Sequence, residues 1–112
     1  MSRTGEVLDA LYATLLERKS ADPKTSYVAG LYAKGADAIL KKVGEEAAEV
    51  LLAAKGSGEG ARAALVHELA DLWFHTLVLM AAYDLPIGEL TDELARRSGR
   101  SGLAEKAARP PK

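Results

Sequence analysis

The sequence contains no cysteine, which excludes disulfide bonds and thiolate metal sites. This lack is typical of proteins from a reducing cytoplasm, and we expect the chain to be cytoplasmic. An excess of one charge is also absent, since 15 basic residues stand against 16 acidic ones, so nothing in the charge points to nucleic acid or a membrane as a partner. The longest uncharged run, residues 72–83, is too short to cross a bilayer.

No stretch shows the alternating pattern of a β-strand, so we predict an all-α fold within a single domain spanning residues 1–112. Apolar residues recur at helical spacing in several segments. Thr4 is placed to cap the first of them. The resulting prediction is a small four-to-five-helix bundle with helices over residues 4–19, 27–33, 35–55, 61–83 and 86–97.

The segment over residues 61–83 is apolar on nearly every side, which predicts a central helix covered from several directions. A chain of 112 residues buries too little surface to supply that cover alone. We therefore expect a homodimer to complete the bundle. In the segment over 86–97, Ile87, Leu90 and Leu94 should face inward, and residues 98–112 form a basic tail.

Two acidic motifs stand out on the second and third long helices. The first contains Glu45, Glu46 and Glu49, and the second contains Glu68 and Asp71. Residues three or four apart share a helix face, so each motif gathers like charges that destabilise a helix unless something offsets them. A divalent cation would do so, and oxygen ligands alone favour magnesium or manganese over zinc.

Two structural alternatives stay open at this point. The first motif is also typical of a solvated helix face on which Lys41 and Lys42 pair with the glutamates one turn away. The second motif could instead form a buried ion pair with Arg62 or Arg96. His75, one turn beyond Asp71, is either a hydrogen-bonded core residue or a support for a metal ligand.

The two motifs resemble the EExxE and ExxD pattern of the all-α, MazG-like nucleotide pyrophosphohydrolases. Three longer segments narrow the resemblance to the phosphoribosyl-ATP pyrophosphatase family. They are SYVAGLYAKGADAILKKVGEEAAEVLLAAK over residues 26–55, HELADLWFHTLVLMA over 67–81 and RRSGRSGLAEKAAR over 96–109. The resemblance covers nearly the whole chain and is closest to the stand-alone form, without a fused cyclohydrolase domain.

The resemblance implies hydrolysis of phosphoribosyl-ATP to phosphoribosyl-AMP and pyrophosphate, the second step of histidine biosynthesis, with Mg2+ as cofactor. It assigns Glu46, Glu49, Glu68 and Asp71 as metal ligands. Glu45 would be a further ligand or the base that orients the attacking water. Because the substrate carries several phosphates, we expect a second group of residues to bind it, namely Ser26, Tyr27, Lys34, Lys42, Arg97, Ser101 and Lys106.

Two other functions compete with this one. A housecleaning nucleoside triphosphate pyrophosphohydrolase would share the acidic motifs and the fold, but the segments around Ser26 and Ser101 argue against it. A non-catalytic helical dimerisation module would leave the acidic face solvated and would not be stabilised by magnesium.

Overall fold

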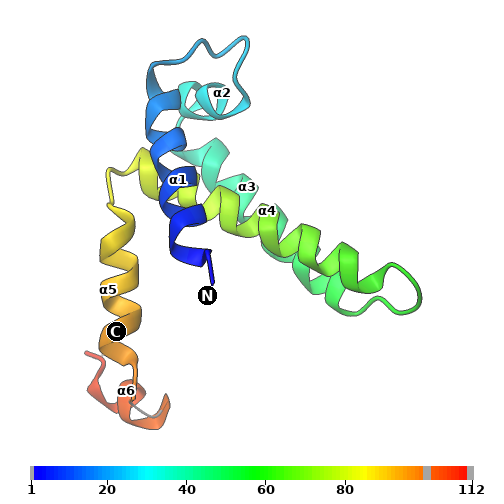
Figure 1. Ribbon diagram of the computed structural model, residues 1–112, viewed down its shortest axis with the longest axis vertical. Helices are drawn as coiled ribbons and strands as arrows, with labels where there is room; N and C mark the ends of the chain where they lie inside the picture. Colours follow the sequence, from blue (N-terminus) through cyan, green and yellow to red (C-terminus); the bar gives the residue numbers. More distant parts are fainter. Residues whose placement is uncertain (1, 100–101, 111–112) are drawn as a thin grey trace.

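A computed structural model describes residues 2–99 and 102–110, and this part of the chain is helical with no β-strand (Figure 1). The all-α prediction is therefore confirmed for these residues. The helices, in chain order, are α1 (Thr4–Glu17), the 3-10 turn η1 (Arg18–Ser20), α2 (Tyr27–Lys34), α3 (Ala36–Ala54), α4 (Ala61–Ala82), α5 (Ile87–Arg97) and α6 (Gly102–Ala108).

The predicted helices are present with small shifts at their ends. The first ends at Glu17 and continues as a 3-10 turn, before the proline that was expected to stop it. Thr4 is not its cap, because Thr4 is already helical and Arg3 holds the cap position. The Ser2 hydroxyl accepts a hydrogen bond from the Thr4 backbone N–H at 3.1 Å, so that side chain satisfies one free donor at the helix start.

Gly35 lets α2 lead directly into α3. Its φ of 98° lies in a region that disfavours other residues. Its N–H donates to the carbonyl oxygens of Leu31 and Tyr32, at 3.1 and 3.2 Å, while its own carbonyl accepts from Ala38 at 3.2 Å. One residue therefore ends the first helix and begins the second.

Helices α3 and α4 form a long antiparallel hairpin that projects from the rest of the chain (Figure 1). The loop between them contains Gly58 and Gly60, both with positive φ, so the turn uses conformations open to glycine. Every acidic residue singled out in the sequence lies on this hairpin.

The hydrophobic core lies where α1, α2, the start of α3 and the end of α4 meet. Leu15, Ile39 and Val78 are its largest fully buried side chains. The Tyr12 hydroxyl donates to the carbonyl oxygen of Leu85, and the Tyr32 hydroxyl donates to that of Leu15 at 2.8 Å. These bonds satisfy two tyrosines at the edge of the core and fix α1 against its neighbours.

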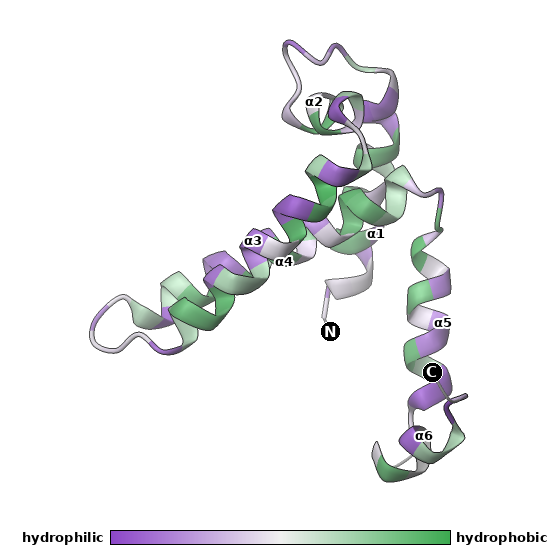
Figure 2. Ribbon diagram, turned by 180° about the vertical axis from the view of Figure 1, so that it is seen from behind, coloured by the Kyte–Doolittle hydropathy of each residue, from purple (hydrophilic) through white to green (hydrophobic). Residues whose placement is uncertain are grey.

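As expected, one chain does not cover α4 from every direction. Its buried residues all lie from His75 onward, whereas Val66 and Trp73 are 60% and 55% exposed. Hydrophobic residues continue along the projecting part of the hairpin (Figure 2). By length and composition α4 also passes as a membrane-spanning helix, but the core helix of a soluble protein meets the same test, and α4 carries Glu68 and Asp71.

The chain is less compact than its length implies. Its radius of gyration is 16.5 Å, whereas a compact domain of this length would have roughly 13 Å. Helices α5 and α6 extend away from the hairpin (Figure 1). The expectation that Leu90 and Leu94 face inward is accordingly wrong within one chain, since they are 40% and 56% exposed.

Candidate active site

Helices α3 and α4 bring three of the predicted metal ligands together. A carboxylate oxygen from each of Glu46, Glu49 and Glu68 lies within 4.8 Å of the other two. Two of these residues come from successive turns of α3, and the third comes from the facing turn of α4. Three carboxylates at this spacing from two helices are a donor set suited to a hard divalent cation.

Glu46 is the most deeply buried of the acidic residues, at 4% exposed. Its Oε1 lies 3.1 Å from the Lys42 ammonium, one turn earlier on α3. Its Oε2 is buried without a hydrogen-bond partner among the described residues. A buried carboxylate oxygen left in this state is costly, and a bound cation would compensate for that cost. The structure thus excludes the alternative in which Glu46 belongs to a solvated helix face.

Glu49 and Glu68 interact directly across the two helices. The hydrogen bond between their carboxyl groups raises the pKa of Glu49, and the negative charge of Glu68 adds to that effect. A raised carboxyl pKa with these causes indicates that negative charge is concentrated between the two helices. A bound cation would offset that charge.

Asp71 groups with Glu68 and with a residue not singled out from the sequence, His67. The His67 Nε2 lies 3.4 Å from Asp71 Oδ2 and 3.7 Å from Glu68 Oε1. The spacing of four residues between His67 and Asp71 was the available signal, because it places both on one helix face. Arg96, considered as a partner for the second motif, forms an ion pair with Glu93 on α5.

Glu45 lies beside the cluster and is more open to solvent than Glu46. Its side chain is 45% exposed, and its carboxylate oxygens lie 3.7 Å from the Lys42 ammonium and 4.0 Å from that of Lys41. A hydrogen bond to Glu46 raises the pKa of Lys42, and the nearby Tyr27 and Glu45 contribute in the same direction. Lys42 therefore keeps its positive charge at the edge of the acidic cluster.

Ser26 caps α2, and Tyr27 is its first residue. Tyr27 lies near Lys42, which contacts Glu46 at one end of the acidic cluster. The Ser26 hydroxyl oxygen caps the helix by accepting a hydrogen bond from the Ala29 N–H at 3.1 Å. The Tyr27 hydroxyl lies 2.8 Å from Nε2 of His75 on α4. His75 is buried, and its Nδ1 contacts the backbone carbonyl of Asp71 at 2.8 Å, so it is a hydrogen-bonded core residue that does not touch the Asp71 carboxylate.

The other predicted substrate-binding residues are not brought to the cluster within one chain. Lys34 is exposed at the end of α2, and the helical rise along α3 places that end about 15 Å from Glu46. Arg97 and Lys106 lie on α5 and α6, which point away from the hairpin (Figure 1). Ser101 lies outside the described residues.

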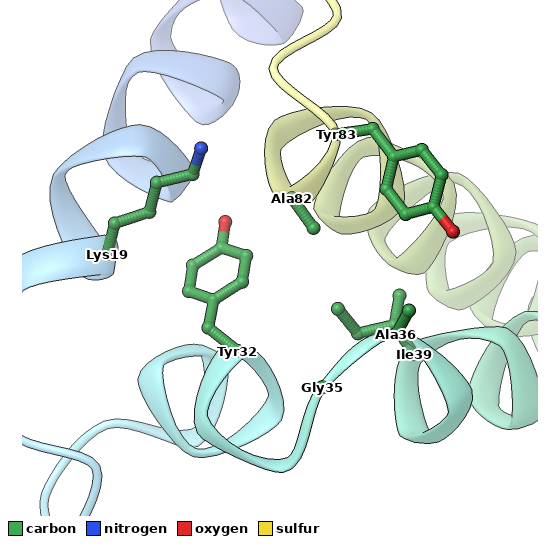
Figure 3. Close-up of a pocket in the computed structure, with 7 residues that line it drawn as sticks. All are labelled: Lys19, Tyr32, Gly35, Ala36, Ile39, Ala82 and Tyr83. Atoms are coloured by element: carbon green, nitrogen blue, oxygen red, sulfur yellow. The ribbon is translucent and has the colours of Figure 1, made fainter.

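A separate open pocket of about 330 Å³ lies at the start of α3, before the acidic motif (Figure 3). Its lining includes Lys19, Tyr32, Gly35 and Tyr83 and none of the residues predicted from the sequence. The Lys19 ammonium is 2.6 Å from the Asp84 carboxylate, so its charge is already paired. This pocket is therefore distinct from the acidic cluster.

Comparison with known proteins identifies a consistent set of relatives. The family model for phosphoribosyl-ATP pyrophosphohydrolases matches residues 8–98. A phosphoribosyl-ATP pyrophosphatase from Neisseria gonorrhoeae is 57% identical over 103 residues, covering 92% of this chain and 94% of the relative. One from Geobacter sulfurreducens is 52% identical over 109 residues, covering 97% and 98%. The matched region contains both acidic motifs and all of α1 to α5 except the first residues.

Proposed function

The chain belongs to the phosphoribosyl-ATP pyrophosphohydrolase family, and we propose that it hydrolyses phosphoribosyl-ATP at the acidic cluster of the α3–α4 hairpin. The products are phosphoribosyl-AMP and pyrophosphate, and the reaction is a step of histidine biosynthesis. The segments around Ser26 and residues 96–109, together with these relatives, favour this substrate over ordinary nucleoside triphosphates and over a non-catalytic module.

The proposed cofactor is magnesium, held by Glu46, Glu49 and Glu68, with Asp71 beside them. The observation that carries this proposal is the buried, unpartnered Oε2 of Glu46, which lies in a residue already grouped with two other carboxylates. A bound magnesium ion would offset charge on the leaving pyrophosphate and lower the pKa of a bound water.

The remaining residues of the cluster have separate roles in this proposal. Lys42 keeps Glu46 in place through its 3.1 Å contact and presents a positive charge to the phosphates. Glu45 is partly exposed, and water can therefore reach its carboxylate. In this proposal it accepts a proton from the attacking water as general base. No residue of this chain needs to form a covalent bond to phosphorus.

We also propose that two copies of the chain form the working enzyme. A groove of about 400 Å³ between α1 and α4 is lined almost wholly by apolar side chains, among them Leu8, Leu69, Trp73 and Phe74. The apolar face of α5 is likewise uncovered. Exposed surfaces of this kind on adjacent helices are typical of a subunit interface, and a second copy supplies matching helices.

Two of the predicted substrate-binding residues, Arg97 at the end of α5 and Lys106 on α6, fit this assembly. Arg97 and Lys106 extend away from the acidic cluster of their own chain, so in a dimer they would serve the cluster of the other copy (Figure 1). With Ser101 they would add positive charge and hydrogen-bond donors for the phosphates of the substrate.

The test is pyrophosphate release from phosphoribosyl-ATP with and without magnesium. We expect magnesium-dependent release by the native chain and its loss in Glu46→Gln and Glu49→Gln, whereas the matched variant Glu59→Gln, in the loop between α3 and α4, should retain it. Release from ordinary nucleoside triphosphates alone would replace the proposed substrate. Equal release by Glu46→Gln would refute the proposed metal site.

A further inference from the structure

We infer that His75 is a positioning residue whose ring accepts a hydrogen bond from the Tyr27 hydroxyl. The Tyr27 oxygen can then only accept, so it receives a hydrogen bond from a sugar hydroxyl of the substrate and does not bind phosphate. The inference rests on the proposed reaction at the acidic cluster. It concerns two residues from α2 and α4 that are 48 positions apart in the sequence.

The first step concerns which ring nitrogen of the buried His75 carries the hydrogen. Its Nδ1 lies 2.8 Å from the backbone carbonyl oxygen of Asp71, which can only accept a hydrogen bond. Nδ1 therefore carries a proton and donates it. Phe74 also packs against the ring, with centroids 5.2 Å apart, so the ring is held in this orientation.

The second step concerns the opposite ring nitrogen. With the proton on Nδ1, a neutral imidazole has Nε2 free as an acceptor. The Tyr27 hydroxyl lies 2.8 Å from Nε2, so the hydroxyl is the donor in this contact. A tyrosine hydroxyl has one proton, and once it is given to His75 the oxygen can only accept from any further partner.

The third step places this oxygen at the site. Tyr27 is 56% exposed although its hydroxyl is tied to a buried histidine, so part of the side chain remains open to a ligand. Its hydroxyl is held by His75, whose ring is bonded to the backbone of Asp71 on α4, and Lys42 contacts Glu46 of the acidic cluster on α3. An acceptor and a cation are therefore both held by residues next to the acidic motifs.

These two groups select different parts of the substrate. Phosphate oxygens of an ionised nucleotide are acceptors, which suits the Lys42 ammonium and does not suit the Tyr27 oxygen. Ribose hydroxyl groups can donate, and phosphoribosyl-ATP has them on both of its sugars. Tyr27 and Lys42 would thus orient a ribose and its neighbouring phosphate relative to the cluster.

The main experiment is a double-mutant cycle on the full-length protein with phosphoribosyl-ATP and magnesium. Loss of one neutral hydrogen bond corresponds to a rise in KM of about 3- to 10-fold, and we expect it in both Tyr27→Phe and His75→Leu with little change in kcat. The double variant should be no worse than either single one. His75→Gln, which offers an acceptor near the place of Nε2, should recover most of the loss.

Tyr83→Phe is the matched control, because Tyr83 directly follows α4, is 55% exposed and lies at the separate pocket. It should leave KM unchanged. The inference is overturned if Tyr27→Phe behaves like Tyr83→Phe, or if the effects of Tyr27→Phe and His75→Leu add. The native chain is assayed alongside the variants. If the native chain itself does not hydrolyse phosphoribosyl-ATP, the proposed function is refuted.

Product inhibition separates sugar binding from phosphate binding. Tyr27→Phe should weaken inhibition by phosphoribosyl-AMP and leave inhibition by pyrophosphate unchanged, whereas Lys42→Met should weaken inhibition by pyrophosphate. Weaker inhibition by pyrophosphate in Tyr27→Phe would overturn the inference.

Nitrogen-15 NMR of the native protein gives a test that does not depend on whether His75→Leu folds. We expect His75 with a protonated Nδ1 and an unprotonated Nε2. A proton on Nε2 would make Tyr27 the acceptor and would overturn the assignment.

Discussion

Glu49 and Glu68 lie on facing helices with a carboxylate oxygen of each within 4.8 Å of the other, so two acidic groups meet in the cluster. Hydrogen bonding to Glu68 and the negative charge of Glu68 raise the pKa of Glu49 above the ordinary value of 4.5. This relationship links the stability of the protein to pH and, through the proposed metal site, to magnesium.

The first prediction concerns that link. Because the folded protein binds the Glu49 proton more tightly than the unfolded chain, its contribution to stability is present in full below pH 4.5 and is lost as pH rises through the raised pKa. Magnesium should reverse the loss at neutral pH by replacing the proton. Thermal unfolding at several pH values, with and without magnesium, measures both effects. A magnesium-independent profile would contradict the prediction.

The second prediction is that Glu49→Gln separates stability from activity. The neutral amide removes repulsion with Glu68, so the metal-free variant should unfold at the same or a higher temperature than the native chain. Magnesium should no longer stabilise it. Activity should fall by at least ~100-fold, since metal-assisted charge stabilisation is typically worth several kcal/mol. Calorimetric unfolding and pyrophosphate release test the two parts separately.

The third prediction uses the single tryptophan of the chain, Trp73. If a second copy covers the groove between α1 and α4, the emission of Trp73 should shift to longer wavelength as the protein is diluted through the dissociation range. Trp73→Glu should give a monomer by light scattering, whereas Tyr83→Glu, at an equally exposed position just after α4, should not. Constant emission at all concentrations, together with a monomeric mass for the native chain, would contradict the dimer.

The fourth prediction concerns α5. Hydrogen bonds from Arg96 and Arg97 lower the pKa of Glu93 to about 2. The stabilisation is therefore present above the ordinary value of 4.5 and is lost as pH falls toward 2. Carboxyl NMR titration measures the pKa directly, and the double variant Arg96→Ala, Arg97→Ala should return it toward 4.5. The exposure of this group makes any effect on global unfolding small.

The sequence was sufficient to predict the helices from α1 to α5 and the grouping of Glu46, Glu49 and Glu68, but it did not predict α6, which lies in the segment expected to be a basic tail. Both predictions depend on local rules, because the helical period decides which residues share a face, and Glu46 and Glu49 are neighbours on that ground alone. The same rules could not assign the burial of Leu90 and Leu94. A helical pattern identifies an apolar face, but it does not say whether that face is covered by the same chain or by another.

Contacts between distant segments could not be predicted from the sequence either. The pairing of Tyr27 with His75 depends on how the loop before α2 returns to α4, and no periodicity encodes that path. His67 was overlooked for a different reason, because its spacing from Asp71 was visible but an exposed histidine is common on helices. The structure adds these contacts and corrects the cap of α1.

The short connection between α3 and α4 has a consequence for the order of folding. Helices joined by a tight loop meet through contacts that are close in sequence, and such contacts form rapidly. The carboxylates of Glu46 and Glu68 should therefore come together in the first, concentration-independent phase, as soon as the hairpin closes. In the proposed dimer, pairing of two chains would follow as a slower phase whose rate rises with protein concentration, so that the proposed metal ligands would be assembled before the enzyme is.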